Sequence, residues 1–180
     1  KYSHDGIGAY HLTLARNKKS LELDLKSDEG KKLFLKLAEV ADVVVDNFSQ
    51  GVTKRLGIDH DSLAKVNSKI ITCSISGFGD TEINRPAYDN IVQGYSGAMS
   101  ITGTDKNNPV KSGIPIADLG AGLYAIIGIL SAIRSREIYD YGEHVDISML
   151  DTQVSLLTYM ATMHFLSGED PDPIGNQHMN

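Results

Sequence analysis

Two runs decide the fold: Asp42-Val-Val-Val-Asp46 and Lys69-Ile-Ile-Thr-Cys-Ser-Ile75. Both are short and rich in β-branched residues, which predicts strands that are covered on both faces in a parallel sheet. A helical spacing of leucines precedes the first run, and two short helices, at 51–56 and 59–66, are predicted between the runs. Alternating strands and helices predict an α/β domain with an open, doubly wound, mostly parallel sheet.

Other elements are predicted on both sides of these runs. Strict alternation in Ser20–Leu25 predicts a short strand, and Ser27 is the expected N-cap of a helix that ends near Ala41. Further helices are predicted at about 88–99, 116–139 and 149–166, and a last strand at 142–148. Ligands of such folds bind at the carboxyl ends of the strands, so 47–55 and 76–90 are the first segments to search.

Composition excludes several classes of function. The 180 residues are 41% apolar, the net charge is −6, and basic residues are scattered, so nucleic acid is not an expected partner. Cys73 is the single cysteine, which rules out an intrachain disulfide and favours a reducing, cytoplasmic location. No Cys or His pair has the spacing of zinc ligands, so no metal is expected.

No membrane span is expected. The apolar stretch 114–133 is interrupted by Asp118, by glycines and by Ser131, and the amino end lacks an apolar signal core.

Familiar catalytic and nucleotide motifs are absent or lack their context. Gly120-Ala-Gly-Leu-Tyr-Ala125 matches a relaxed dinucleotide fingerprint, but no buried strand precedes it. No phosphate loop, His-Glu-x-x-His motif or Gly-x-Ser-x-Gly elbow occurs. Cys73 lies in an apolar run and is interpreted as a buried hydrophobe rather than a nucleophile.

Asp118 allows two interpretations. An aspartate at the start of a long apolar helix is commonly an N-cap or first-turn residue, and the same holds for Asp151. The glycines around Asp118, however, leave the backbone open to a bulky ligand, and a helix amino terminus stabilises negative charge at an attacked carbonyl. These are the requirements of a carboxylate nucleophile.

Several segments in order resemble family III CoA transferases (CaiB/BaiF), the group of formyl-CoA transferase. They are Asn17–Lys26, Ala41–Phe48, Arg55–Gly57, Ile75–Gly79, Pro86–Asn90, Gly113–Leu119 and Gly142–Met149. The resemblance implies a Rossmann-like large domain of an interlocked homodimer that transfers CoA between an acyl-CoA and a carboxylic acid. It implies that residues 1–166 form the central part of this domain, and that 167–180 begin a linker to an absent small domain.

The resemblance also implies roles for single residues. Asp118 corresponds to the family's nucleophile, which carries CoA as an aspartyl thioester. Residues expected around the nucleotide end of CoA are Leu23, Lys26, Asn47, Phe48, Val52 and Arg55. Tyr88 and Asp89 match positions near the acyl group, while a basic residue that some members carry just before the tyrosine is not aligned, since Pro86 stands there and Arg85 one step earlier.

Two alternatives stay open at this point. An α-methylacyl-CoA racemase shares the fold, but such enzymes use a histidine where this sequence has Tyr88, and tyrosine is a poor base near neutral pH. The chain can also be a CoA-binding fragment without activity of its own.

Overall fold

A computed structural model describes residues 2–83 and 85–178 of the chain. The chain divides into two units, Lys1–Phe34 and Leu35–Asn180, and the boundary falls within helix α2 (Asp28–Ala38). Lys1 and residues 179–180, at the outer ends of the predicted domain and linker, lie outside the described residues.

The first unit begins with a hairpin and a short helix. Strands β1 (Ser3–His4) and β2 (Ile7–Gly8) pair antiparallel, and helix α1 (Ala9–Leu14) follows directly. The two turn residues between the strands, Asp5 and Gly6, have positive φ angles of 49° and 78°, as required in a two-residue hairpin turn.

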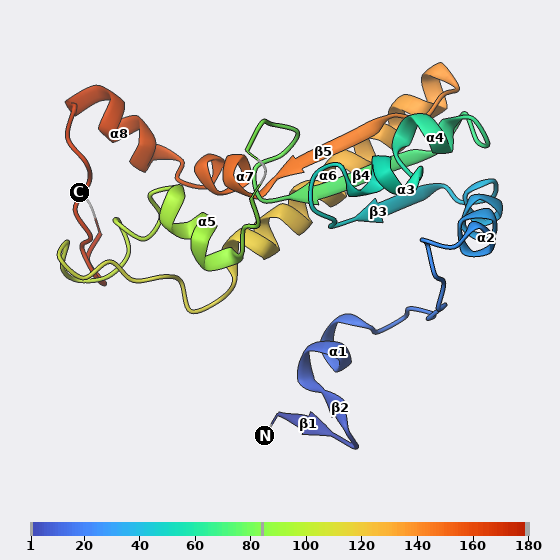
Figure 1. The fold of residues 1–180 in the computed structure, drawn as a ribbon. Helices are drawn as coiled ribbons and strands as arrows, with labels where there is room; N and C mark the ends of the chain where they lie inside the picture. The colour runs from blue at the N-terminus through green and yellow to red at the C-terminus, as the bar shows by residue number, and fades with distance from the viewer. Residues whose placement is uncertain (1, 84, 179–180) are drawn as a thin grey trace. The chain divides into compact units, whose positions relative to one another are not determined.

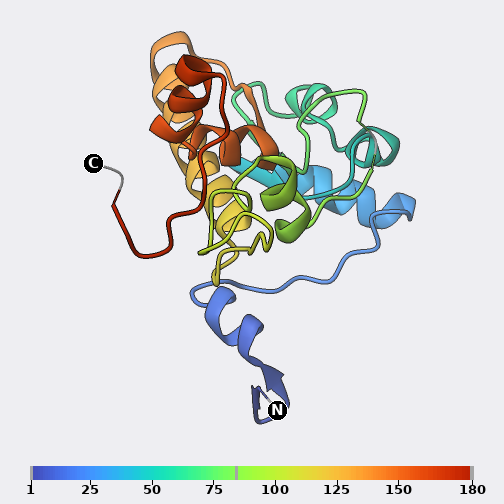
Figure 2. The ribbon, with the colours of Figure 1, turned by 90° about the vertical axis from the view of Figure 1, so that its left-hand side faces the viewer.

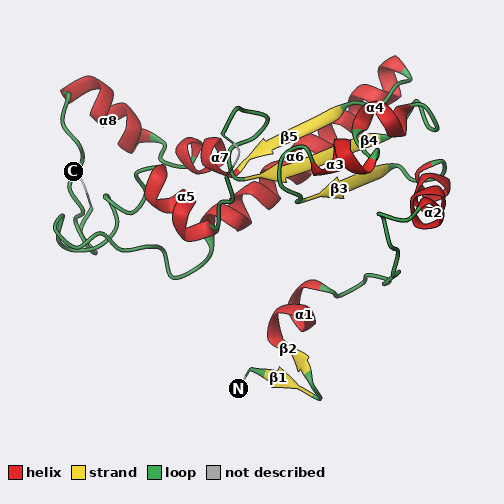
Figure 3. Ribbon diagram, in the orientation of Figure 1, coloured by secondary structure: helices red, strands yellow, loops and turns green. Residues whose placement is uncertain are grey.

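The predicted strand at Ser20–Leu25 is wrong, because this segment is drawn as loop up to the start of α2 (Figure 3). Alternation favours a strand only where a neighbouring strand supplies hydrogen bonds, and here the backbone bonds locally instead. The Asp24 carbonyl accepts from the Ser27 amide at 3.1 Å and from the Ser27 hydroxyl at 2.9 Å. The Ser27 hydroxyl in turn accepts from the Gly30 amide at 3.1 Å, so the predicted N-cap is confirmed.

The second unit is built on a parallel sheet in the order β3 (Val43–Asp46), β4 (Ile71–Ser76) and β5 (His144–Ser148). Helix α6 (Ile116–Tyr139) lies on one side of this sheet, and α3 (Val52–Leu56) and α4 (His60–Ala64) lie on the other (Figures 1 and 2). The predicted α/β class with a parallel sheet is therefore confirmed.

The two faces of the sheet differ in character. Residues such as Ile71 and Cys73 lie on the face that packs against α6 and are fully buried. The opposite face carries alternating polar residues: Asp46, Thr72, Ser74, Ser76, His144 and Asp146. The expectation that strand 42–46 is covered on both faces is thus wrong, since Val45 is 54% exposed and Asp46 opens into a cavity.

Helix α6 has the predicted bounds and packs through small side chains. Its buried residues are Ala117, Gly120, Ala121, Ala125 and Ala132. By length and composition α6 could also cross a membrane, a description that fits the core helix of a soluble protein equally well.

Two further helices pack at the amino end of α6. Helices α5 (Asp89–Tyr95) and α7 (Met149–Ser155) contribute Val92 and Met149 to a buried cluster with Ala117 and Ala121. The predicted closing helix 149–166 is split, because Thr158 adopts φ 52° and ψ −123° between α7 and α8 (Tyr159–Ser167). Ser148 caps α7 by accepting from the Asp151 amide at 3.1 Å.

Candidate functional site

Asp118 is the third residue of α6 and does not cap the helix. The N-cap position is held by Pro115, and no side chain at that position bonds to the helix. The Asp118 side chain is exposed at the helix amino end. The structure therefore excludes the N-cap but agrees with a first-turn residue, so this geometry alone leaves both interpretations of Asp118 open.

Asp89, from the first turn of α5, satisfies the amino end of α6 instead. One of its carboxylate oxygens accepts from the Ala117 amide at 2.9 Å and lies 3.4 Å from the Asp118 amide. The first amides of a helix have no partner within the helix, so a carboxylate from another element stabilises them well. Two carboxylates thus share one helix end, and only Asp89 is engaged by its backbone.

The electrostatics of this pair bear on Asp118. Although Asp118 is exposed, its carboxylate is partly desolvated by neighbouring atoms. This desolvation and, secondly, the negative charge of Asp89 raise the pKa of Asp118 above its ordinary value. A carboxylate with a raised pKa is a better nucleophile once ionised, because it is less stabilised by its surroundings.

Gln93 is a residue of this site that the sequence analysis missed. Its side-chain amide donates to the second carboxylate oxygen of Asp89 at 2.6 Å, one turn along α5. A sequence signal was present in the i, i+4 spacing of Asp89 and Gln93 on a predicted helix, but only the structure shows that the side chain is buried.

A cavity of about 250 Å³ lies at the carboxyl ends of β3 and β4. It brings together three of the predicted residues, Asn47, Phe48 and Tyr88. The Asn47 side-chain amide donates to the Ile75 carbonyl at 2.5 Å and so ties the two strand ends together. Tyr88 immediately precedes Asp89, which connects the cavity wall to the carboxylate pair.

Arg85 lines the same cavity as Tyr88, although its position in the sequence does not match that of the family's basic residue. Its guanidinium carbon lies 4.5 Å from the centre of the Tyr95 ring and 5.2 Å from that of Phe78. Within the described part of the chain Arg85 forms no ion pair. A cation that is held over aromatic faces and lacks a carboxylate partner is suited to bind an anionic ligand.

The other predicted CoA-binding residues are distributed over both units. Val52 is half-buried and Arg55 exposed on α3, which starts after Gly51 with φ 76°. Leu23 and Lys26 belong to the first unit; Leu23 is half-buried, and the exposed Lys26 donates its amide to the Asp24 carboxylate at 3.0 Å.

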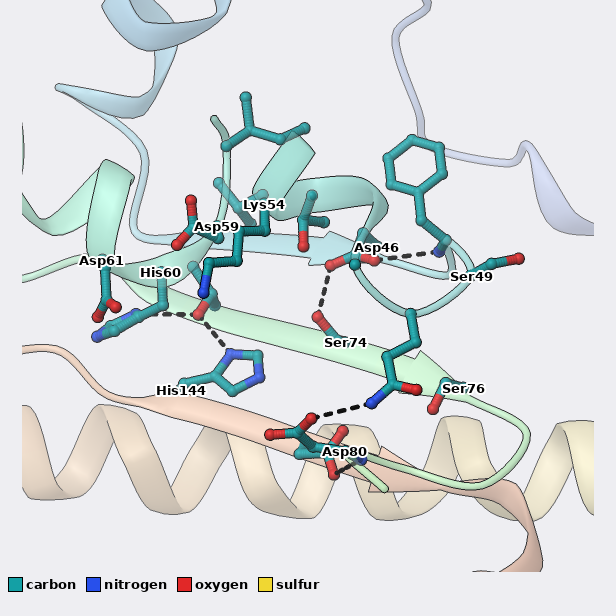
Figure 4. A pocket seen from close by; sticks show the side chains of 18 of the residues that line it. Asp46, Ser49, Lys54, Asp59, His60, Asp61, Ser74, Ser76, Asp80 and His144 are labelled. Atoms are coloured by element: carbon teal, nitrogen blue, oxygen red, sulfur yellow. Dashed lines mark hydrogen bonds between the residues drawn. The ribbon is translucent and has the colours of Figure 1, made fainter. Parts of the chain in front are cut away.

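A second, larger cavity of about 480 Å³ opens on the polar face of the sheet, below α3 and α4 (Figure 4). Thr72 bridges two histidines there: its hydroxyl lies 3.0 Å from the His60 Nδ1 and 2.7 Å from the His144 Nδ1. Burial and the neighbouring His144 lower the pKa of His60. The Ser74 hydroxyl donates to the Asp46 carboxylate at 2.7 Å.

The charges around this larger cavity disfavour phosphate. Lys54 supplies one ammonium, whereas carboxylates come from Asp46, Asp59, Asp61, Asp80 and Asp146. Excess negative charge repels a nucleotide diphosphate, so this cavity is unsuited to the phosphate end of CoA. Among the described residues, no group of three or more His, Cys, Asp or Glu is arranged to hold a metal ion.

Comparison with known proteins links the whole chain to one family. The model of CoA-transferase family III matches residues 1–180. A crystal structure of a CaiB/BaiF family protein from Brucella suis is similar with a TM-score of 0.86 and 37% identity, covering 89% of this chain and 43% of that one.

Two curated relatives carry specific names. A succinate–glutarate CoA-transferase of Agrobacterium fabrum is 39% identical over 96% of this chain and 44% of its own length. A succinyl-CoA:mesaconate CoA-transferase of Haloarcula hispanica is 37% identical over 97% of this chain and 46% of its own length. The chain thus spans about half the length of the curated relatives it matches.

Proposed function

The chain belongs to CoA-transferase family III, and from this premise we propose that it carries the nucleophile of an enzyme that moves CoA from an acyl-CoA to a carboxylic acid. The observation that carries the proposal is that the two aspartates at the amino end of α6 have different partners. Asp89 accepts the helix amides, which leaves the Asp118 carboxylate free to react.

The proposed reaction proceeds by acyl transfer through Asp118. The carboxylate attacks the thioester carbonyl, the carbon–sulfur bond breaks, and a mixed anhydride forms while CoA leaves as a thiolate. The thiolate then attacks the Asp118 carbonyl of the anhydride, which releases the first acid and leaves an aspartyl-CoA thioester. The acceptor acid attacks this thioester in the same way, and the thiolate finally takes the new acyl group and restores Asp118.

The amino end of α6 assists this chemistry. Negative charge develops on the carbonyl oxygen during each attack, and the positive end of a helix dipole stabilises it.

CoA binding is proposed for the residues that match the family's nucleotide site. Leu23, Lys26, Val52 and Arg55 would contact the nucleotide end, with Arg55 as a phosphate partner of fixed charge. Asn47 and Phe48 would border the path of CoA toward the carboxylate pair. The acidic character of the larger cavity supports this assignment, because phosphates would be repelled there and would bind instead near basic residues such as Lys26 and Arg55.

The acyl group is assigned to the smaller cavity, which Tyr88 lines, and to Asp89, which follows Tyr88 in the chain. The named relatives act on succinate, glutarate and mesaconate, all of which carry a second carboxylate. Arg85 lines this cavity without a carboxylate partner in the described chain, so we propose a dicarboxylic acyl group whose distal carboxylate binds Arg85. An interlocked homodimer and a cytoplasmic location remain part of the proposal.

The test uses the complete natural protein with succinyl-CoA and glutarate. Asp118→Asn should abolish CoA transfer while CoA binding and folding persist, and rapid quenching of the wild type should give an adduct on the peptide that contains Asp118. Asp151→Asn is a matched control, because Asp151 is the third residue of α7 as Asp118 is of α6.

Several outcomes would contradict the proposal. Substantial transfer by Asp118→Asn, or an adduct on Asp89, Asp151 or Cys73, would remove Asp118 as nucleophile. Exchange of the substrate's α-proton without movement of CoA would favour a racemase.

A further inference from the structure

We propose that Gln93 is a positioning residue that fixes Asp89 against the amino end of α6 and thereby sets the orientation of Asp118. This inference rests on the proposed function, because it concerns the residue assigned there as nucleophile. It assigns a role to a residue that lines none of the cavities described above.

Both ends of the Gln93 side chain are engaged. The residue is 1% exposed, its Nε2 donates to Asp89 at 2.6 Å, and its Oε1 accepts from the Ser112 amide at 2.8 Å. A buried amide with both ends satisfied has a defined place, because any displacement leaves a polar group unpaired.

The orientation of this amide follows from its partners. Ser112 offers a backbone N–H, which can only donate, and an ionised Asp89 carboxylate can only accept. The oxygen of Gln93 must therefore face Ser112, and the nitrogen must face Asp89. A flipped amide would lose both hydrogen bonds at once.

Gln93 thus holds the amino end of α6 from two directions. Ser112 lies in the segment that leads into the helix, and Asp89 binds the amides of the first turn. Because Asp118 sits in that turn, a shift of either contact would move the attacking carboxylate. Misplacing a reacting group by about 1 Å can cost about 100-fold in rate.

The neutrality of Gln93 matters as much as its shape. The charged groups around it are Asp89 on its own helix, Asp118 beyond Asp89, and Lys111, whose ammonium donates to the Ser112 carbonyl at 3.2 Å. Asp151 is the charged residue of the neighbouring helix α7. A carboxylate at position 93 would still accept from Ser112, but when ionised it would repel Asp89.

Gln93→Glu is therefore the discriminating variant in the complete protein. Position 93 is buried and lies beside the Asp89 carboxylate, and both features raise the pKa of a glutamate there above its ordinary value of about 4.3. At about pH 5 the introduced carboxyl group is therefore protonated and donates to Asp89 as glutamine does, so kcat should stay within about threefold of the wild type. At about pH 8 the same group is ionised and displaces Asp89, and kcat should fall about 100-fold with little change in KM for acyl-CoA. The deficit must grow as the pH rises, which a merely structural defect would not produce.

Gln153→Glu is the matched control. Gln153 is a buried glutamine of α7, and within the described residues its Oε1 has no hydrogen-bond partner. This substitution should lower the melting temperature without a pH-dependent loss of kcat relative to the wild type. A similar pH-dependent deficit in both variants would overturn the inference.

A charge swap keeps the test decisive if Gln93→Glu does not fold. In the double variant Asp89→Asn and Gln93→Glu, the new amide at position 89 can donate to the new carboxylate at position 93, while the amide oxygen accepts from Ala117. We expect this variant to fold and to turn over at least about tenfold faster at pH 8 than Gln93→Glu. Where Gln93→Glu is unfolded, we expect the double variant to restore a cooperative unfolding transition and the adduct on the Asp118 peptide. A swap that does neither would overturn the inference.

Failure of this inference is distinguishable from failure of the proposed function. If only the role of Gln93 is wrong, the wild type transfers CoA, Asp118→Asn does not, and Gln93→Glu shows a pH-independent effect or none. If the proposed function is wrong, the wild type forms no Asp118 adduct.

Discussion

At the scale of single residues, the amino end of α6 gives two aspartates unequal roles. Asp89 gains hydrogen bonds from the helix backbone, whereas partial desolvation and the charge of Asp89 raise the pKa of Asp118. A raised folded-state pKa means that ionised Asp118 is less favourable in the folded than in the unfolded protein. The resulting loss of stability appears as the pH rises through the raised pKa and is absent below the ordinary pKa of aspartate. A residue that costs stability when ionised is consistent with selection for chemistry.

The order of the family's motifs in the sequence pointed to Asp118, Asp89 and Tyr88 as candidate site residues. It could not predict the hydrogen bonds that distinguish Asp89 from Asp118. Asp89 and Ala117 are 28 positions apart, and no local pattern predicts that one would cap the helix of the other. Arg85 is similar, since its place beside Tyr88 depends on stacking against Tyr95 rather than on sequence spacing.

Arg85 yields a prediction about acyl selectivity. Arg85→Met keeps most of the apolar side chain but removes the guanidinium, so KM for a dicarboxylic acceptor should rise about 10- to 100-fold, the worth of a hydrogen bond to a charged group. A monocarboxylic acceptor should be nearly unaffected. Steady-state kinetics with glutarate and butyrate in the complete protein measure the difference.

Arg134→Met is the control for this change, because Arg134 is an exposed residue of α6 paired with Glu137. It should leave both acceptors unchanged. Equal effects of Arg85→Met on both acceptors would show that Arg85 does not bind the distal carboxylate.

At the scale of elements, the strands and helices that the sequence predicted best are those whose pattern reflects their own packing. Helix α6 begins and ends as predicted, and β3 and β4 lie within one or two residues of their predicted bounds. The failures have long-range causes. Ser20–Leu25 has the alternating pattern of a strand but pairs with no strand in the described structure. The closing helix breaks at Thr158, where no glycine or proline in the sequence predicts a break.

The polar face of the sheet was also beyond the sequence analysis. Continuous β-branched runs predicted strands buried on both sides, and Val43–Val45 and Ile70–Ile71 support that interpretation locally. The partners in register decide the outcome, because Asp46 lies beside Ser74 and Thr72 beside His144 across the sheet. Only the pairing shows that these polar side chains share one face.

Two glycines of α6 provide a matched test of its packing on the sheet. A Cβ at Gly128 would lie 2.7 Å from the Val145 Cγ1, a stiff side chain of β5, so Gly128→Ala should destabilise by about 1–3 kcal/mol. A Cβ at Gly122 would meet nothing within 4 Å, so Gly122→Ala should stabilise by about 1 kcal/mol through helix propensity.

Chemical unfolding of the two variants beside the wild type measures these changes. The opposite signs are the informative result, since both substitutions add the same methyl group to the same helix. If Gly128→Ala were neutral or stabilising, the close approach of α6 to β5 would be wrong.

At the scale of the whole molecule, helix α6 exposes a row of large apolar side chains. Five large apolar residues recur at helical spacing and are all exposed: Leu119, Leu123, Ile126, Ile127 and Leu130. The buried residues of the same helix are small: Ala117, Gly120, Ala121, Ala125 and Ala132. A contiguous apolar stripe of this kind usually marks a surface that another part of a protein covers.

We therefore predict that this apolar stripe is buried in the complete natural protein. Single cysteines at two stripe positions, Leu123→Cys and Ile127→Cys, should react with a maleimide at least about tenfold more slowly than Lys65→Cys, a position that is exposed outside the stripe. Native Cys73 does not interfere, because burial and the nearby carboxylates of Asp46 and Asp146 raise the pKa of its thiol to about 11. In denaturant all the introduced thiols should react at similar rates, which verifies that the protection comes from the fold. If the two stripe positions react as fast as position 65 in the native protein, α6 is uncovered, and the interlocked assembly proposed for this family member must bury a different surface.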